Sequence, residues 1–179
     1  MAYTYDCFDQ PTHSATKCDT EKELGRIRHI ALVKTSSTLV DPTDQTEWEA
    51  LEASKEALII RQVRGESDGG APVEGEGYGD QPTTVDGYNF TATFFDGRVL
   101  QNVDFYNQLV KNIGNYKLWY VTETRVWDTG AIPTVAPIVP IGADPTQRIN
   151  VSGTFKWQAE NPIPTPYAKP GTFFDELPN

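Results

Sequence analysis

The sequence predicts a mainly β protein: an antiparallel β-sandwich or barrel with two short flanking helices and an extended arm at each end. The first observation is the alternation of apolar and polar residues in residues 88–95 and 148–158. A period of two places neighbouring side chains on opposite faces of a strand, so each strand has one buried and one solvated face. The second is composition, because 11% aromatic residues with 14 Gly and 13 Pro favour strands joined by many turns.

The chain of 179 residues is long enough for one domain with a substantial core. We place a β-sandwich domain at residues 25–158, between an N-terminal arm of residues 1–24 and a proline-rich C-terminal arm of residues 159–179. The net charge of −10 argues against nucleic-acid binding, which needs Lys and Arg side chains to contact the phosphates. No apolar stretch approaches the ~20 residues of a membrane span, and the start lacks the pattern of a secretory signal. We therefore expect no membrane partner and synthesis in a cytoplasm.

The first strand is expected at residues 26–34, where apolar residues on both faces indicate cover on both sides. A helix should follow, because Asp41 can act as its N-cap, Pro42 suits the first helical position and Asp44 stands three residues after the cap. Trp48 is then the expected anchor of this helix on the sheet.

A second helix is expected at residues 103–113, where the apolar spacing is helical and Gly114 suits a left-handed C-cap. Asp96-Gly97 before it has the sequence of a hairpin turn. Residues 130–145 contain four prolines and cannot sit centrally in a sheet. The remaining strands are expected at residues 58–64, 88–95, 116–124 and 148–158.

Residues 65–87 form a glycine-rich stretch with six acidic residues and no Lys or Arg. We interpret it as a long acidic loop, and loops of this length are usually functional or ordered by a partner. Gly75, Gly77 and Gly79 have a spacing similar to a phosphate loop, but the neighbouring acids would repel an anion and no GK[ST] follows. The loop is therefore a predicted subunit interface. Its candidate residues are Glu66, Asp68, Glu74, Glu76, Tyr78 and Asp80.

Phe173 and Phe174 complete this set of predicted interface residues. Two adjacent Phe in a terminal arm gain little by exposure to solvent. They can anchor the arm on a neighbouring subunit, or pack back on the sheet of their own chain. The sequence leaves both alternatives open.

The residues of ordinary catalysis are scarce, so we predict a protein that is not an enzyme and uses no cofactor or metal. The chain has no GxSxG, no HExxH and no phosphate loop, and its acids cluster in one stretch instead of on converging strands. Cys7 and Cys18 flank His13, which suggests zinc, but the wide spacing favours two free thiols. His29 is expected to be a hydrogen-bonded sheet residue.

Two non-catalytic classes remain. A carbohydrate-binding module could use aromatic side chains as a platform, although aromatic residues in alternating strands are usually core. A subunit of a symmetric assembly explains the two arms and the acidic loop together, because a neighbouring copy would order them. The aromatic candidates for a platform are Tyr88, Trp119, Tyr120 and Trp127.

The order of elements resembles the tail tube (major tail) protein of tailed bacteriophages. The resemblance covers residues 26–157. The segments DPTDQTEWEAL, DFYNQLVKNIGNYKLWYV and GTFKWQ are also similar to uncharacterised virion proteins of phages that infect Bacteroidetes-type hosts. The resemblance to tail tube proteins implies a virion structural protein that assembles with itself into hexameric rings. The rings stack into a tube with an electronegative lumen, through which DNA passes without specific binding.

In this family a long loop of one ring stacks on the next ring, and residues 65–87 match that loop. Residues 103–113 match the helix that flanks the sandwich. Family members usually carry one helix, whereas this sequence predicts two. Another virion protein, such as a head decoration, ring or adaptor protein, is therefore the alternative, and other virion proteins are expected partners in either case.

Overall fold

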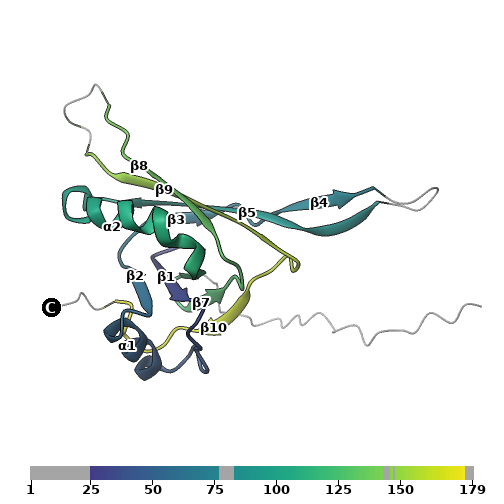
Figure 1. Cartoon of the computed structure of the whole chain (residues 1–179), viewed down its shortest axis with the longest axis horizontal. Helices are drawn as coiled ribbons and strands as arrows, with labels where there is room; N and C mark the ends of the chain where they lie inside the picture. The colour runs from purple at the N-terminus through teal and green to yellow at the C-terminus, as the bar shows by residue number, and fades with distance from the viewer. Residues whose placement is uncertain (1–24, 77–82, 143–145, 147, 176–179) are drawn as a thin grey trace, which may run out of the picture.

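The computed structural model describes residues 25–76, 83–142, 146 and 148–175, which form two antiparallel sheets with two helices (Figure 1). Sheet A has the order β3-β5-β9-β8, with β4 also paired to β5, and sheet B the order β10-β7-β6-β1-β2. Sheet A consists of β3 (Arg64–Ser67), β4 (Ala71–Gly75), β5 (Thr84–Asp96), β8 (Thr134–Ile138) and β9 (Val151–Ala159). Sheet B consists of β1 (His29–Lys34), β2 (Ala57–Ile60), β6 (Tyr116–Val121), β7 (Arg125–Asp128) and β10 (Thr165–Ala168). The predicted mainly β sandwich is confirmed, and neither sheet closes into a barrel among the described strands.

The elements form three layers with a core on each side of sheet B. Sheet A is the upper layer in Figure 1, with sheet B and α2 (Val99–Asn112) below it and α1 (Gln45–Ala53) lowest. In β1, Leu32 belongs to the first core, between the sheets, whereas Ala31 and Val33 belong to the second core, below sheet B. The expectation that the first strand is covered on both faces is confirmed.

The two alternating segments predicted as strands are neighbours in sheet A. Phe90 lies opposite Trp157 in the register of β5 and β9, and their rings stack with centroids 5.2 Å apart. Phe94 lies opposite Gly153, where its ring occupies the space that a Cβ atom at Gly153 would need. The buried faces of both strands thus interlock in the first core.

Helix α1 begins three residues later than the sequence predicts from Pro42. Its N-cap is Asp44, whose side chain accepts the N–H of Thr46 at 2.8 Å. The carboxylate of Asp41 instead accepts the N–H of Thr43 at 2.9 Å, in the turn before the helix. Trp48 is fully buried and its indole N–H donates to the carbonyl of Pro42 at 2.9 Å, so its predicted role as anchor is confirmed.

Helix α2 is longer than predicted at its N-terminus. Asp96 does not close a hairpin turn with Gly97; its carboxylate accepts the N–H of Arg98 at 2.9 Å, and the chain turns directly into the helix. Gly114 lies in the short 3-10 helix η1 (Ile113–Asn115) and not in a left-handed C-cap. The proline-rich segment contributes β8, which is an edge strand as its prolines require.

His29 is a buried residue of β1, and the expectation that it is hydrogen-bonded holds for Nδ1 but not for Nε2, which is buried without a hydrogen-bond partner. Its Nδ1 accepts the N–H of Gln62 at 3.2 Å, and its ring centroid lies 6.0 Å from that of Phe174. Burial lowers the pKa of His29 from 6.5 to about 4, although the Asp175 carboxylate acts in the opposite direction. The imidazole is therefore neutral in the folded protein at neutral pH.

This pKa predicts a loss of stability in mild acid. The unfolded chain takes up the His29 proton first as the pH falls, so the folded state loses stability between pH 6.5 and 4. Between pH 7 and pH 5 the free energy of unfolding of the wild type should fall by about 2 kcal/mol more than that of His29→Asn, because Asn does not titrate. Asn can still accept the Gln62 N–H, so the variant keeps this hydrogen bond. Urea unfolding of both proteins at both pH values measures this difference. Equal losses in the two proteins would contradict it.

Candidate assembly surfaces

Residues 65–87 are not an unpaired loop, and the prediction of one is wrong. The segment contains most of β3, all of β4 and the start of β5. β4 pairs antiparallel with β5 from Ala71 opposite Asn89 to Gly75 opposite Thr84, with an irregularity between Val73 and Glu74. Because β9 pairs with β5 only from Tyr88 onward, the outer part of β4 and β5 forms a two-stranded projection beyond the sheet (Figure 1). We call residues 71–76 and 83–87 the acidic hairpin.

The predicted interface acids differ in their exposure to solvent and in their hydrogen bonding. Glu74 and Glu76 are exposed on the acidic hairpin, and Glu66 is exposed on β3. Asp68 organises the turn between β3 and β4, because its carboxylate accepts the N–H groups of Gly70 and Thr91, both at 3.0 Å. Tyr78 and Asp80 lie outside the described residues.

The outer face of sheet A is polar, and no described element covers it (Figure 1). Thr93 of β5 lies between Glu66 of β3 and Thr154 of β9 in the register. In the next row, Thr91 lies opposite Lys156. We call this surface, built mainly from hydroxyl and amide side chains, the open sheet face.

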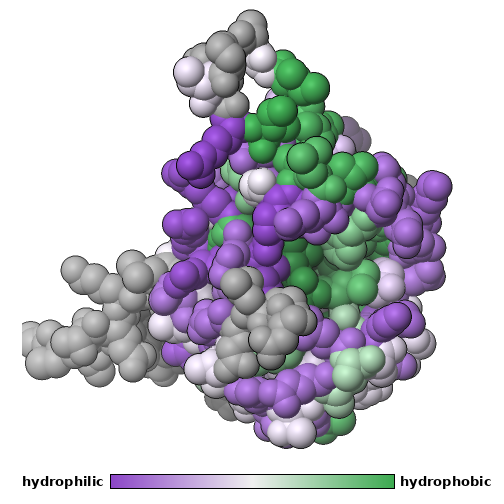
Figure 2. All heavy atoms as spheres, turned by 90° about the vertical axis from the view of Figure 1, so that its left-hand side faces the viewer, coloured by the Kyte–Doolittle hydropathy of each residue, from purple (hydrophilic) through white to green (hydrophobic). Residues whose placement is uncertain are grey.

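Sheet A ends in an apolar surface on the side away from the acidic hairpin. Figure 2 shows hydrophobic side chains gathered there, beside the connection from β8 to β9. Phe95 is 46% exposed, Ile138 61%, Ile141 79% and Ile149 50%. Exposed apolar groups gathered in this way mark an interaction surface. This surface is absent from the predictions made from sequence, although Ile138, Val139 and Ile141 form an apolar stretch around Pro140 that could have signalled it.

Phe173 and Phe174 pack on their own chain, which is the second of the two alternatives that the sequence left open, so their assignment to the subunit interface is wrong. They are 5% and 0% exposed in the second core, and their ring centroids lie 6.3 and 5.1 Å from that of Trp48. The Arg61 guanidinium carbon lies 4.9 Å from the Phe173 ring centre. β10 pairs with β7, and the described C-terminal residues therefore complete sheet B and the second core instead of forming an extended arm.

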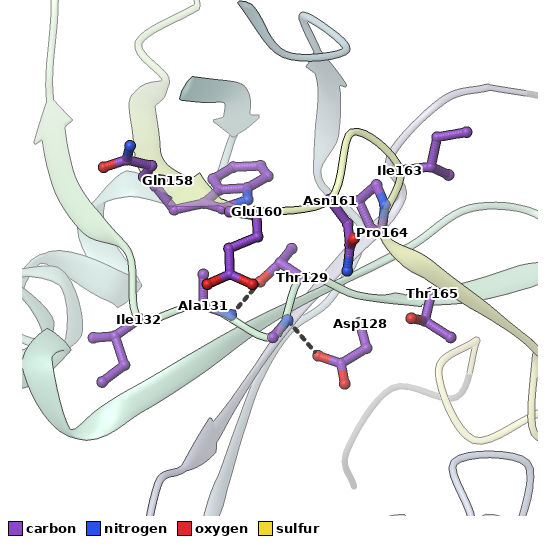
Figure 3. A pocket seen from close by; sticks show the side chains of 13 residues that line it. Asp128, Thr129, Ala131, Ile132, Gln158, Glu160, Asn161, Ile163, Pro164 and Thr165 are labelled. Carbon is purple, nitrogen blue, oxygen red and sulfur yellow. Dashed lines mark hydrogen bonds between the residues drawn. The ribbon is translucent and has the colours of Figure 1, made fainter. Parts of the chain in front are cut away.

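A separate hollow of about 520 Å³ lies where β7, β9 and β10 approach one another. Figure 3 shows Glu160 and Asn161 pointing into it. Burial raises the pKa of the Asp128 carboxyl, against the opposing effects of the Gly130 N–H, 2.7 Å away, and of Lys117. Such a mixture of carboxylates and amides can hydrogen-bond a polar ligand.

The four aromatic residues considered for a sugar platform do not share one surface. Trp119 is 6% exposed in the second core, and its neighbour Tyr120 packs against the first core. Tyr120 stacks on Trp127 with centroids 6.1 Å apart, and Tyr88 also packs against the first core. The arrangement follows the usual core role of aromatic residues in alternating strands.

Comparisons of the chain with protein-family models, with curated proteins and with solved structures find no match. Among the described residues, no helix has the length and apolar character needed to cross a membrane. The described residues also contain no group of three or more His, Cys, Asp or Glu arranged to hold a metal ion. The predicted thiol pair Cys7 and Cys18, with His13, lies outside them.

Proposed function

We propose that this protein is a structural subunit of a phage virion that assembles with itself into stacked, hexameric rings forming a tail tube. The observation that carries the proposal is the continuity of the open sheet face with the acidic hairpin. β5 runs through both, so one strand supplies a polar wall and a projection beyond it. The described residues of the acidic hairpin contribute to neither core of their own subunit, so contact with another copy would give the projection a role.

The chemistry of the open sheet face suits a channel wall. DNA binds proteins chiefly through Lys and Arg on its phosphates, and the centre of this face carries threonine and serine hydroxyls together with amide side chains. Two basic residues also lie on this face: Arg64 is opposite Phe95 in the register, and Lys156 is opposite Thr91. In the proposed tube DNA slides past such a wall without being held, and the net charge of −10 adds repulsion at longer range.

The edges of sheet A suit assembly into a ring. β8 is one end of the strand order and has no further partner among the described strands. At the other end, the edge of β3 is partly covered, because Gly65 and Ile27 exchange both of their backbone hydrogen bonds at 3.0 Å. Exposed edges are a liability in a monomer, because their backbone N–H and C=O groups can pair with another chain. In the proposed ring, β8 of one copy lies beside the part of the β3 edge of the next copy that Ile27 leaves uncovered, and the sheets line a common channel.

Shortening the acidic hairpin should abolish stacking and leave the fold intact. Replacing residues 74–86 by Asn-Gly keeps Val73 opposite Gly87 and closes the two strands with a two-residue turn. The described residues among those removed, 74–76 and 83–86, contribute nothing to either core, so the urea midpoint should stay unchanged. Sedimentation velocity and negative-stain microscopy of the full chain and the shortened variant measure the assembly.

The matched control for this experiment is Glu49→Ala, which removes an exposed acid from α1, in the layer farthest from sheet A. We expect the wild type and this control to form stacked rings or tubes, and the shortened variant to stop at subunits or single rings. Tubes formed without the hairpin would show that it is not the stacking element. A wild type that stays monomeric at high concentration would contradict the proposed function itself.

The alternative is another virion protein, such as a ring or adaptor protein or a head decoration. The presence of both α1 and α2 favours it, because tail tube proteins usually carry one helix. The same micrographs separate the two proposals: single rings that never stack indicate an adaptor, and stacked rings indicate a tube. The carbohydrate-binding class has less support, because its four aromatic candidates do not share one surface.

A further inference from the structure

We infer that the end of sheet A opposite the acidic hairpin is the docking site for the acidic hairpin of a second copy. This inference rests on the proposed self-assembly and names the surface that performs it. We call the site the Phe95 surface. It consists of Arg26, Arg64, Phe95, Ile141, Arg148 and Asn150.

The Phe95 surface is a pair of adjoining hollows on either side of one exposed aromatic ring. Arg64 lies directly opposite Phe95 in the register of β3 and β5. A hollow of about 630 Å³ is lined by Arg26, Arg64 and Phe95, and a hollow of about 470 Å³ by Phe95, Ile141 and Arg148. Asn150 lines both, so the hollows form one continuous concave surface.

The charge of this surface is positive and is not neutralised within the described chain. Arg26, Arg64 and Arg148 are exposed, and none of them forms an ion pair with a described carboxylate. One acid, Glu66, also lines the larger hollow, which leaves an excess of two positive charges from three Arg against one Glu. Three further arginines already have acidic partners: Arg28 contacts Glu123, Arg61 contacts Glu52 and Arg98 contacts Asp96.

The acidic hairpin has the complementary properties. Glu74, Glu76 and Asp86 are exposed on it, and residues 65–87 contain no Lys or Arg. It also carries an apolar contact group, because Val85 is 52% exposed. Acids can therefore meet arginines while Val85 meets the apolar part of the Phe95 surface. Such complementarity steers encounter and excludes wrong partners.

The two surfaces lie at opposite ends of the same strand, and this position makes their contact repeat. β5 runs from Thr84 in the hairpin to Phe95, which at about 3.3 Å per residue is roughly 36 Å. A hairpin cannot reach the far end of its own rigid sheet, whereas the hairpin of another copy can. A contact between two different patches of identical copies is head-to-tail, and it builds closed rings or continuing stacks.

Reversal of charge on each surface, and then on both, tests the inference. Arg64→Glu with Arg148→Glu should raise the concentration needed for half-assembly roughly tenfold or more, because it replaces attraction by repulsion. Glu74→Arg with Glu76→Arg should have a similar effect, and the protein carrying all four changes should regain assembly. Lys111→Glu, an exposed site on α2, is the control, and it changes the net charge by as much as either single Arg→Glu reversal, Arg64→Glu or Arg148→Glu, measured alone. Sedimentation velocity over a concentration series gives the concentration of half-assembly for the wild type and for each variant.

A photoreactive side chain at Glu76 identifies the contact directly when unlabelled and isotope-labelled chains are mixed. Cross-links between chains should fall in peptides that contain Arg64, Phe95 or Arg148. Cross-links elsewhere, including residues 1–24, would overturn the inference, as would assembly that resists the double Arg reversal. In both cases the proposed function stands if the wild type still forms tubes. A wild type that never assembles overturns both.

Discussion

Replacing Phe174 with alanine should lower the free energy of unfolding by about 3–5 kcal/mol. The Phe174 side chain is fully buried in the second core, where its ring centroid lies 5.1 Å from that of Trp48 and 4.9 Å from that of Phe173. Truncation leaves a cavity between α1 and sheet B, and both elements lose contacts that hold them together. Urea unfolding monitored by tryptophan fluorescence measures the change.

Ile163→Ala is the matched control, because Ile163 lies in the same C-terminal stretch and is 69% exposed. Its effect should stay within about 0.5 kcal/mol. A loss below about 1 kcal/mol for Phe174→Ala would mean that the C-terminal segment is not part of the core in solution. The aromatic pair would then be available to a neighbouring subunit after all.

Asp96→Ala should cost about 3–5 kcal/mol, because it leaves buried polar groups without their partner. The Asp96 side chain is fully buried, and its carboxylate accepts the Tyr106 hydroxyl at 2.9 Å and the Asn102 amide at 2.8 Å. It also accepts the N–H of Arg98. Burial alone would raise the pKa of Asp96, but these hydrogen bonds hold it below its ordinary value. The ionised carboxylate therefore joins the end of β5 to α2.

Asp104→Ala provides the comparison, because Asp104 is exposed on the same helix. Its effect should stay within about 0.5 kcal/mol. The free energies come from urea unfolding at pH 7, where Asp96 is ionised. An Asp96→Ala variant as stable as the Asp104→Ala variant would show that the carboxylate does not hold α2 in place.

The strands with a period of two could be predicted because the signal is local. In β5 and β9 one face meets the first core and the other meets solvent, and the alternation of residues records this directly. Trp48 could also be assigned to a helix–sheet contact from its place in an amphipathic segment. The start of α1 could not be predicted correctly, because Asp41 and Asp44 can each cap a helix. Tertiary packing decides which of the two acids does so.

The acidic hairpin could not be predicted from local pattern. β4 (APVEG) contains Pro and Gly and has no alternation, and it becomes a strand because β5 extends far enough to pair with it. The position of Phe173 and Phe174 was open for a similar reason. Whether an aromatic pair packs on its own chain depends on the space that Trp48 and Trp119 leave beside sheet B, which no local rule describes.

The Phe95 surface was missed because its parts are distant in sequence. Arg26, Arg64, Phe95 and Arg148 meet only after β5 pairs with β3 and β9. Each of these residues is unremarkable in its own segment. Their convergence at the end of sheet A opposite the acidic hairpin is a property of the fold. It makes the proposed contact between copies head-to-tail.

The most direct test of the account is a cryo-electron microscopy reconstruction of the particle formed by the full chain. The proposed assembly should appear as stacked rings in which the open sheet face, including Thr91, Thr93 and Thr154, lines a central channel. The acidic hairpin of one copy should also contact another copy. A reconstruction in which this face points outward, or a protein that remains a monomer at every concentration, would contradict the proposed assembly.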